Sequence, residues 1–90
     1  VLLGSEEPEL RRLAATNLAT LGESAADLVP RLTLALDDSD EEVVRPIVQL
    51  LGDIGPAASG ALPKLQQIAF EKEGDVKQAA TQAMKKIEAR

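Results

Sequence analysis

Five carboxylates within six residues, Asp37 to Glu42 (DDSDEE), form the densest group of potential ligands in the chain. Carboxylate oxygens at such close spacing could bind Ca²⁺. The run lacks the glycine and the distal glutamate that an EF-hand loop requires at fixed positions. Acidic residues are also favoured in the first turn of a helix, because they face the positive end of its dipole. We therefore interpret the run as the start of a helix and expect no metal site.

A second candidate is the segment Gly55 to Gly60 (GPAASG), whose glycines have the spacing of a phosphate-binding loop. It continues with Ala61 and Leu62 instead of the lysine and hydroxyl residue of such loops, so we interpret it as a turn between helices. The chain contains no histidine and no cysteine. This removes the commonest general base and the thiolate metal ligands. We expect no catalytic residue, no cofactor and no enzymatic activity in these residues.

The charge of the chain argues against a nucleic-acid partner. Fifteen acidic and ten basic residues give a net charge of −5, and Phe70 is the only aromatic residue. Nucleic-acid binding usually requires a basic excess and often stacking aromatics. No apolar run approaches the ~20 residues that span a membrane. The basic pairs Arg11–Arg12 and Lys85–Lys86 are interpreted as solvated helix faces, with contact to an acidic partner as the alternative. The expected partner is another protein or a peptide.

The elements that would present a binding surface belong to a unit that the sequence repeats. Leu10–Gly22 (LRRLAATNLATLG) aligns with Val43–Gly55 (VVRPIVQLLGDIG) at a shift of 33 residues, and a second equal shift leads to Val76. The same shift places Pro30 on Pro63 without a gap. Equal shifts of this length are typical of stacked helical repeats.

Each unit opens with an amphipathic helix, whose apolar residues recur at intervals of three and four and so share one face. Acidic residues precede each helix, and Ser39 with Glu42 fits a capping box. Gly22 and Gly55 follow the last apolar residues and suit a left-handed helix stop. The three apolar sets are Leu10, Leu13, Ala14, Leu18 and Leu21; Val43, Ile47, Leu50, Leu51 and Ile54; and Val76, Ala79, Ala80, Ala83, Met84 and Ile87.

A shorter second helix completes the first two units. Pro30 and Pro63 must lie in its first turn, where no backbone N–H is needed. Asp27 and Gly60 then fall near the N-cap positions. The links 23–26 and 56–59 are expected to be short turns, so that the paired helices run antiparallel.

This pattern resembles HEAT-like repeats of the phycobilisome-lyase type. The resemblance implies a binding scaffold in which the second helices line the concave face and an Asp–Arg ladder joins neighbouring repeats. The matching segments are Glu9-Leu10-Arg11 to Leu21-Gly22 with Val29-Pro30-Arg31-Leu32, Val43 to Ile54-Gly55 with Leu62-Pro63-Lys64-Leu65, and Asp75-Val76-Lys77 to Ile87.

The middle unit departs from the pattern at two positions. Val44 stands where the other units have the basic residues Arg11 and Lys77, although Arg45 follows it directly. Pro46 falls inside the predicted helix, where it removes one backbone N–H and crowds the preceding turn. We expect a kink near this proline and a helix that continues beyond it.

We predict an all-α fold, a right-handed α-solenoid of antiparallel helix pairs with about five helices and a 33-residue period. Residues 1–3 would end a preceding repeat helix, 4–36 and 37–70 would form two HEAT-like repeats, and 71–90 would supply the first helix of a third. Leu18, Leu32 and Leu51 should lie in the core, and Phe70 should pack on the first helix of the third unit. Incomplete units without polar caps indicate a fragment of a longer array.

Two functions are compatible with this reading. The first is a non-catalytic protein–protein interaction scaffold whose concave face exposes Arg31, Leu34, Lys64 and Gln67. The second is a structural segment of a larger enzyme or sensor, such as a lyase-like protein, whose chemistry lies in other residues. End-to-end self-association through the alanine-rich ends is also compatible with the pattern.

Overall fold

The computed structural model describes residue 3 and residues 5–89, and those residues form helices and connecting segments without a strand. The prediction of an all-α repeat fold is confirmed, while the handedness of the solenoid stays a prediction. Five α-helices and the 3₁₀-helices η2 and η3 follow one another within residues 5–89. They are α1 (Pro8–Ala19), η2 (Gly22–Leu28), α2 (Val29–Ala35), α3 (Glu41–Ile54), η3 (Gly55–Ala61), α4 (Leu62–Glu71) and α5 (Asp75–Glu88).

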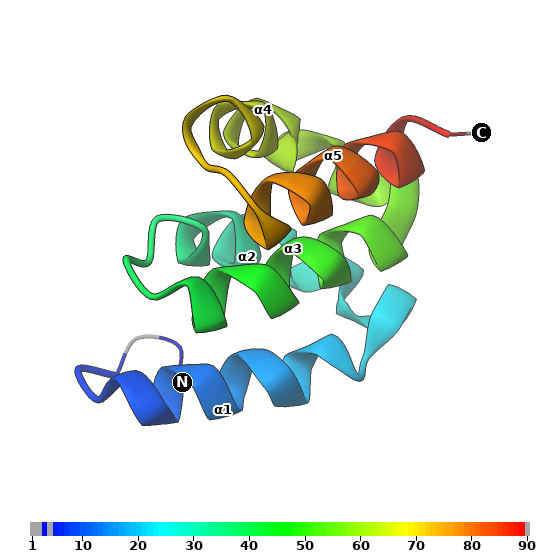
Figure 1. Ribbon diagram of the computed structural model, residues 1–90. Helices are drawn as coiled ribbons and strands as arrows, with labels where there is room; N and C mark the ends of the chain where they lie inside the picture. The colour runs from blue at the N-terminus through cyan, green and yellow to red at the C-terminus, as the bar shows by residue number, and fades with distance from the viewer. Residues whose placement is uncertain (1–2, 4, 90) are drawn as a thin grey trace.

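The helices form two layers. The first helices of the repeats, α1, α3 and α5, stack in sequence order, with α3 packed between the other two (Figure 1). The second helices, α2 and α4, lie on one side of this stack. Helix α4 packs mainly on α5, and α2 packs on η3 and α3. Neighbouring units therefore contact each other chiefly through the first helices, as expected for a stack of repeats.

The hydrophobic core runs through the middle of the stack. Leu32 and Leu51 are fully buried, as predicted, whereas Leu18 is only partly buried and packs against the edge of the core. Leu18 differs from its repeat equivalent because α1 has a neighbouring first helix on one side only. The largest fully buried side chains are Leu32, Val43, Ile47, Val48, Leu50, Leu51 and Leu65.

Helices α3 and α5 approach each other most closely at a glycine. A Cβ atom added to Gly52 would lie 3.0 Å from the Cα of Ala83 and 3.2 Å from its Cβ. Both residues are buried. The small side chains at this crossing let the two backbones come together, and a larger side chain at position 52 would force them apart.

The start of α3 corrects one sequence prediction. The N-cap is Asp40, whose side chain accepts a hydrogen bond from the N–H of Glu42 at 2.9 Å. The capping box of Ser39 with Glu42 is therefore wrong by one residue. The cause is a hydrogen bond from the N–H of Asp40 to the Asp38 side chain at 2.8 Å, which turns the chain before the helix. The carboxylate of Asp40 then occupies the capping position.

The links within each repeat also differ from the prediction, because they are 3₁₀-helices instead of open turns. Each continues directly into the second helix, and the N-cap residues are Leu28 and Ala61 instead of Asp27 and Gly60. Side-chain caps are unnecessary here. The N–H of Val29 bonds to the carbonyl of Ala26, and the corresponding N–H in the second repeat is satisfied in the same way. Both prolines lie in the first turn of their helices, as predicted.

Of the two predicted glycine stops, only Gly55 ends a helix, as the C-cap of α3 with a φ angle of +79°, a region that L side chains rarely adopt. Gly22 also has a positive φ angle, +53°, but it begins η2, because α1 already ends at Ala19 with Thr20 as its C-cap. Helix α3 continues through Pro46, as predicted, whereas the kink near this proline stays a prediction. Leu3 is partly buried against the core, whereas the rest of the predicted helix end at residues 1–3 lies outside the described residues.

Candidate protein-binding surface on the second helices

The four predicted binding residues lie on the outer surface of α2 and α4. Arg31, Leu34 and Gln67 are exposed, and Lys64 is half-buried. A spacing of three residues places Arg31 beside Leu34 on α2, and Lys64 beside Gln67 on α4. We call the surface formed by these four residues and Phe70 the second-helix face. The structure brings Lys64 and Gln67 together at one hollow, and it leaves Arg31 and Leu34 outside that hollow.

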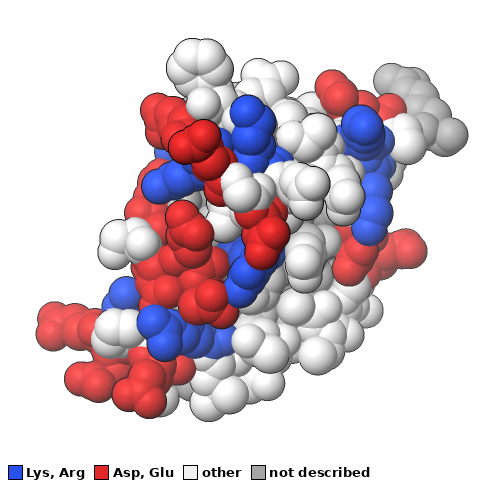
Figure 2. Space-filling model, in the orientation of Figure 1, with Lys and Arg blue, Asp and Glu red and all other residues white. Residues whose placement is uncertain are grey.

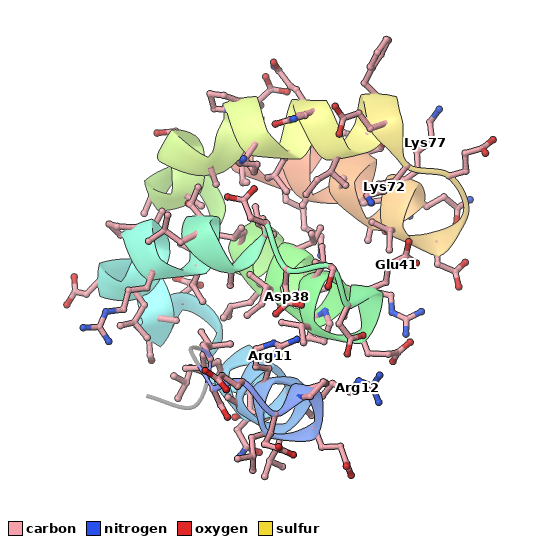
Figure 3. The ribbon with its side chains drawn as sticks, turned by 90° about the vertical axis from the view of Figure 1, so that its left-hand side faces the viewer. Arg11, Arg12, Asp38, Glu41, Lys72 and Lys77 are labelled. Carbon is pink, nitrogen blue, oxygen red and sulfur yellow. The ribbon has the colours of Figure 1, made fainter. Side chains whose placement is uncertain are left out.

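The hollow lies between the start of α3 and the side of α4, and has a volume of about 180 Å³. Its apolar walls come from Leu36, Val44, Ile68 and Val76. Charged side chains surround it, including Glu41 from α3 and Lys72, which follows α4 (Figure 3). Polar and charged residues make up most of the lining, and the apolar walls are largely buried. The hollow can therefore hold a partner side chain by its apolar part while the charged groups orient it by ion pairs.

Lys64 is not a free cation, because its Nζ lies 2.6 Å from Oδ1 of Asp37. This contact joins α4 to the segment before α3 and so closes one side of the hollow. The Gln67 side chain donates a longer hydrogen bond of 3.3 Å to Glu71, one turn further along α4. Both polar side chains are therefore partly oriented before any partner arrives, which lowers the entropy cost of binding.

Phe70 corrects the sequence analysis. It does not pack on α5, because its side chain is 89% exposed at the end of α4. Leu34 on α2 is similarly open, at 72%. The register explains the position of Phe70, since Asp37 is its equivalent one repeat earlier and is also exposed. The equivalence of Phe70 with Asp37 already indicated an exposed position, whereas the usual burial of aromatic side chains favoured packing on α5.

The loops before α1, α3 and α5 gather along one edge of the molecule, which we call the charged edge (Figure 2). Acidic side chains dominate it, with basic ones between them. Arg11 on α1 donates from Nε to Asp38 at 2.6 Å, and the two side chains are only 16% and 10% exposed. Figure 3 shows this pair between the two helices. Arg11 also donates to the carbonyl of Ser5 at 2.9 Å, so that it fixes two segments.

Two further ion pairs extend this ladder between repeats. The Nε of Arg12 lies 2.7 Å from Asp40, which joins α1 to the start of α3. Arg45 contacts Asp75 of α5 at 3.7 Å and Glu42 of its own helix at 2.8 Å. Arg45 is the repeat equivalent of Arg12 and makes the corresponding contact, which is longer and more exposed. The position of Arg11 is occupied by the buried Val44 in this repeat, so Arg45 does not replace the contact that Arg11 makes with Asp38.

Asp40 is both a helix cap and a member of the ladder. The hydrogen bond from the Arg12 guanidinium lowers the pKa of the Asp40 carboxyl below its ordinary value, and the N–H of Glu42 acts in the same direction. Both donors favour the ionised form of the carboxyl. In the acidic run at 37–42, Asp37 pairs with Lys64, Asp38 with Arg11 and Asp40 with Arg12. Asp40 also accepts a hydrogen bond from a helix N–H, in agreement with the interpretation of the run as a helix start.

None of the helices among the described residues is both long enough and apolar enough to cross a membrane. The chain matches the family model of HEAT repeats over residues 1–85. It therefore belongs to the HEAT repeat family, whose members are stacked helix pairs that typically bind other proteins. Comparisons with curated proteins and with solved structures gave no match.

Proposed function

We propose that the chain is a non-catalytic protein–protein interaction scaffold that binds its partner through the second-helix face. The observation that carries this proposal is the exposure of two large apolar side chains, Leu34 and Phe70, on the second helices. Large apolar side chains with polar groups beside them can act as the anchors of a protein interface. Arg31, Lys64 and Gln67 supply those groups.

The partner surface suggested by this face is mixed in character. An apolar side chain of the partner would enter the hollow beside α4, while Leu34 and Phe70 would cover further apolar surface. Acidic groups of the partner would meet Arg31 and compete with Asp37 for Lys64. The affinity would then depend on a few apolar anchors, with the charges contributing orientation and association rate.

The experiment is a binding measurement with two kinds of variant. A partner captured by the purified chain is identified, purified and titrated calorimetrically against the chain. The double variant Leu34→Ser/Phe70→Ser should weaken binding by at least about tenfold, as expected for anchor residues. The charge-reversal variant Arg31→Glu/Lys64→Glu should slow association and weaken binding, because these charges contribute orientation and association rate. Equal affinities of all variants would contradict the proposal.

A matched control tests the location of the site. Lys86→Glu reverses an exposed charge on α5, whose nearest acidic group is Asp53 at 3.4 Å. It should leave the affinity unchanged, because Lys86 does not belong to the second-helix face. If the isolated chain binds no protein, the alternative function gains support, namely a structural segment of a larger enzyme or sensor.

The subtype of the repeats is also part of this proposal. The segments Val29-Pro30-Arg31-Leu32 and Leu62-Pro63-Lys64-Leu65 support a phycobilisome-lyase type of HEAT repeat. Pro30 and Pro63 lie in the first turn of the second helices, and the residues after them include Arg31 and Lys64 of the face that we propose for binding. A lyase activity is not proposed for these residues, since they contain neither histidine nor cysteine.

A further inference from the structure

A groove between two first helices has no part in the second-helix face. It lies between α3 and α5, which pack side by side (Figure 1), and it has a volume of about 380 Å³. Among the described residues, those that line it belong to α3 and α5, and none belongs to α2 or α4. A molecule bound in this groove would therefore leave the second-helix face free.

The floor of the groove consists of small residues. Gly52 lies on α3, and Ala79 and Ala83 lie on α5. At the crossing of α1 and α3, the 33-residue shift places larger residues at these three positions, namely Ala19, Pro46 and Leu50. Leu50 is fully buried there, so its side chain occupies volume that Ala83 leaves open. Of these two crossings, the one between α3 and α5 therefore has the small residues that form the floor.

Three glutamines form the walls of the groove. Gln49 lies on α3, and Gln78 and Gln82 lie on α5. All three are exposed. Their side-chain amides make no hydrogen bond to any other residue in the described part of the chain. Each amide offers two N–H donors and a carbonyl acceptor, so the walls present both kinds of hydrogen-bonding group to a ligand.

The charged side chains beside the groove neutralise one another. Arg45 contacts Glu42 at 2.8 Å and Asp75 at 3.7 Å. Lys86 contacts Asp53 at 3.4 Å. The groups that remain without a partner are thus the neutral amides. Because complementary charge decides which partners a surface selects, this groove suits an uncharged ligand better than an acidic or a basic one.

The spacing of the two glutamines on α5 matches an extended peptide. Gln78 and Gln82 are four residues apart, a rise of about 6 Å along the helix. In an extended chain the main-chain groups that face one side recur every second residue, at about 6.6–6.8 Å. The two amides can therefore bond successive main-chain groups along one edge of such a chain, while Gln49 bonds the other edge. A helical ligand would not offer these groups, because its main-chain groups bond one another.

We propose that the groove between α3 and α5 binds an uncharged, extended peptide segment by its main chain. Gln49, Gln78 and Gln82 hydrogen-bond to the N–H and C=O groups on its two edges, as in other modes of recognition that use an extended main chain. Alternate side chains of the segment then point to the floor and to solvent. Those that face Gly52 and Ala83 meet a small apolar surface, which favours alanine or serine at every second position.

The test is an NMR titration of the isotope-labelled chain with the uncharged peptide acetyl-Ser-Ala-Ser-Ala-Ser-Ala-Ser-amide. The side-chain amide signals of Gln49, Gln78 and Gln82 should shift and approach saturation by about 10 mM peptide, since a few hydrogen bonds give weak binding. The double variant Gln78→Ala/Gln82→Ala should lower the affinity by about tenfold or more. Gln66→Ala removes an exposed amide from α4 and should leave the affinity unchanged. The absence of saturable shifts, or equal affinities of all three chains, would overturn the proposal.

Two further peptides show which groups are recognised. The same peptide with N-methylated alanines lacks the main-chain donors on one edge and should bind at least about tenfold more weakly. Raising the salt concentration should not weaken the binding of the original peptide, because neutral amides are not screened. A peptide with glutamate in place of alanine tests the cations beside the groove. If it binds more tightly than the original and salt weakens its binding, Arg45 recognises the ligand by charge and the proposal fails.

Discussion

At the scale of single residues, the contact between Arg12 and Asp40 makes a prediction about pH. The pKa of the Asp40 carboxyl is lowered in the folded chain by the hydrogen bond from Arg12. The stabilising contribution of Asp40 is therefore complete above the ordinary carboxyl pKa of about 3.9, and it is lost as the pH falls through the lower folded-state pKa.

Asp40→Asn isolates this contribution, because asparagine can still cap the helix while the charge is removed. The urea midpoint of the natural chain should exceed that of the variant at pH 6. The two midpoints should converge as the pH falls through the lowered folded-state pKa of Asp40, because the carboxyl is then protonated in both states. Parallel curves over this pH range would show that the ion pair with Arg12 does not stabilise the fold.

The residue scale also shows where sequence reasoning stops. The acidic run was correctly interpreted as a helix start, but the choice between Ser39 and Asp40 as the cap depended on the turn made by Asp38. Either side chain can cap a helix. Phe70 was misplaced for a related reason, because its burial depended on which helix would face it. The local sequence predicts neither the turn made by Asp38 nor the helix that faces Phe70.

At the scale of the helices, the crossing at Gly52 decides how closely α3 and α5 pack. Gly52→Leu should destabilise the chain by about 1–3 kcal/mol, since overpacking of the crossing exceeds the gain of about 0.8 kcal/mol in helix propensity. Urea denaturation measures the difference. Gln49→Leu is the matched control, because it places the same side chain on an exposed position of α3 and should change stability little. If Gly52→Leu stabilised the chain, α3 and α5 would be able to move apart at this crossing without a loss of stability.

Helical periodicity predicted every first helix and the second helices with their starting prolines. It did not predict η2 and η3. The short sequences GESAADL and GPAASGA contain turn-forming residues, and both an open turn and a 3₁₀-helix satisfy the same preferences. The choice is made by packing, since Ala25, Ala58 and Ala61 of these segments are buried.

At the scale of the whole molecule, the stack should depend on its last helix. Helix α5 covers the side of α3 that carries Val44 and Val48, and it is the main neighbour of α4. A chain that ends at residue 73 should lose about 3–6 kcal/mol from the exposure of these two valines alone, a large share of the usual stability of a small domain. Its urea midpoint and its binding of an apolar dye report the effect. An unchanged midpoint would contradict nearest-neighbour stacking.

The proposed binding surface also shows what the sequence does not predict at this scale. The register placed Arg31, Leu34, Lys64 and Gln67 on the second helices, and they do lie there. It could not predict the hollow beside Lys64, because that space depends on the distance between α4 and the start of α3.

The uneven contact between the two layers has a mechanical consequence. The first helices are stacked directly on one another, whereas α2 and α4 are connected mainly through η3 and the contact of Lys64 with Asp37. Bending the molecule toward its first helices would stretch the second layer, where few contacts resist. We therefore expect the layer of first helices to resist bending and the layer of second helices to deform more easily. A bulky partner could be accommodated by splaying α2 from α4 without separating the repeats.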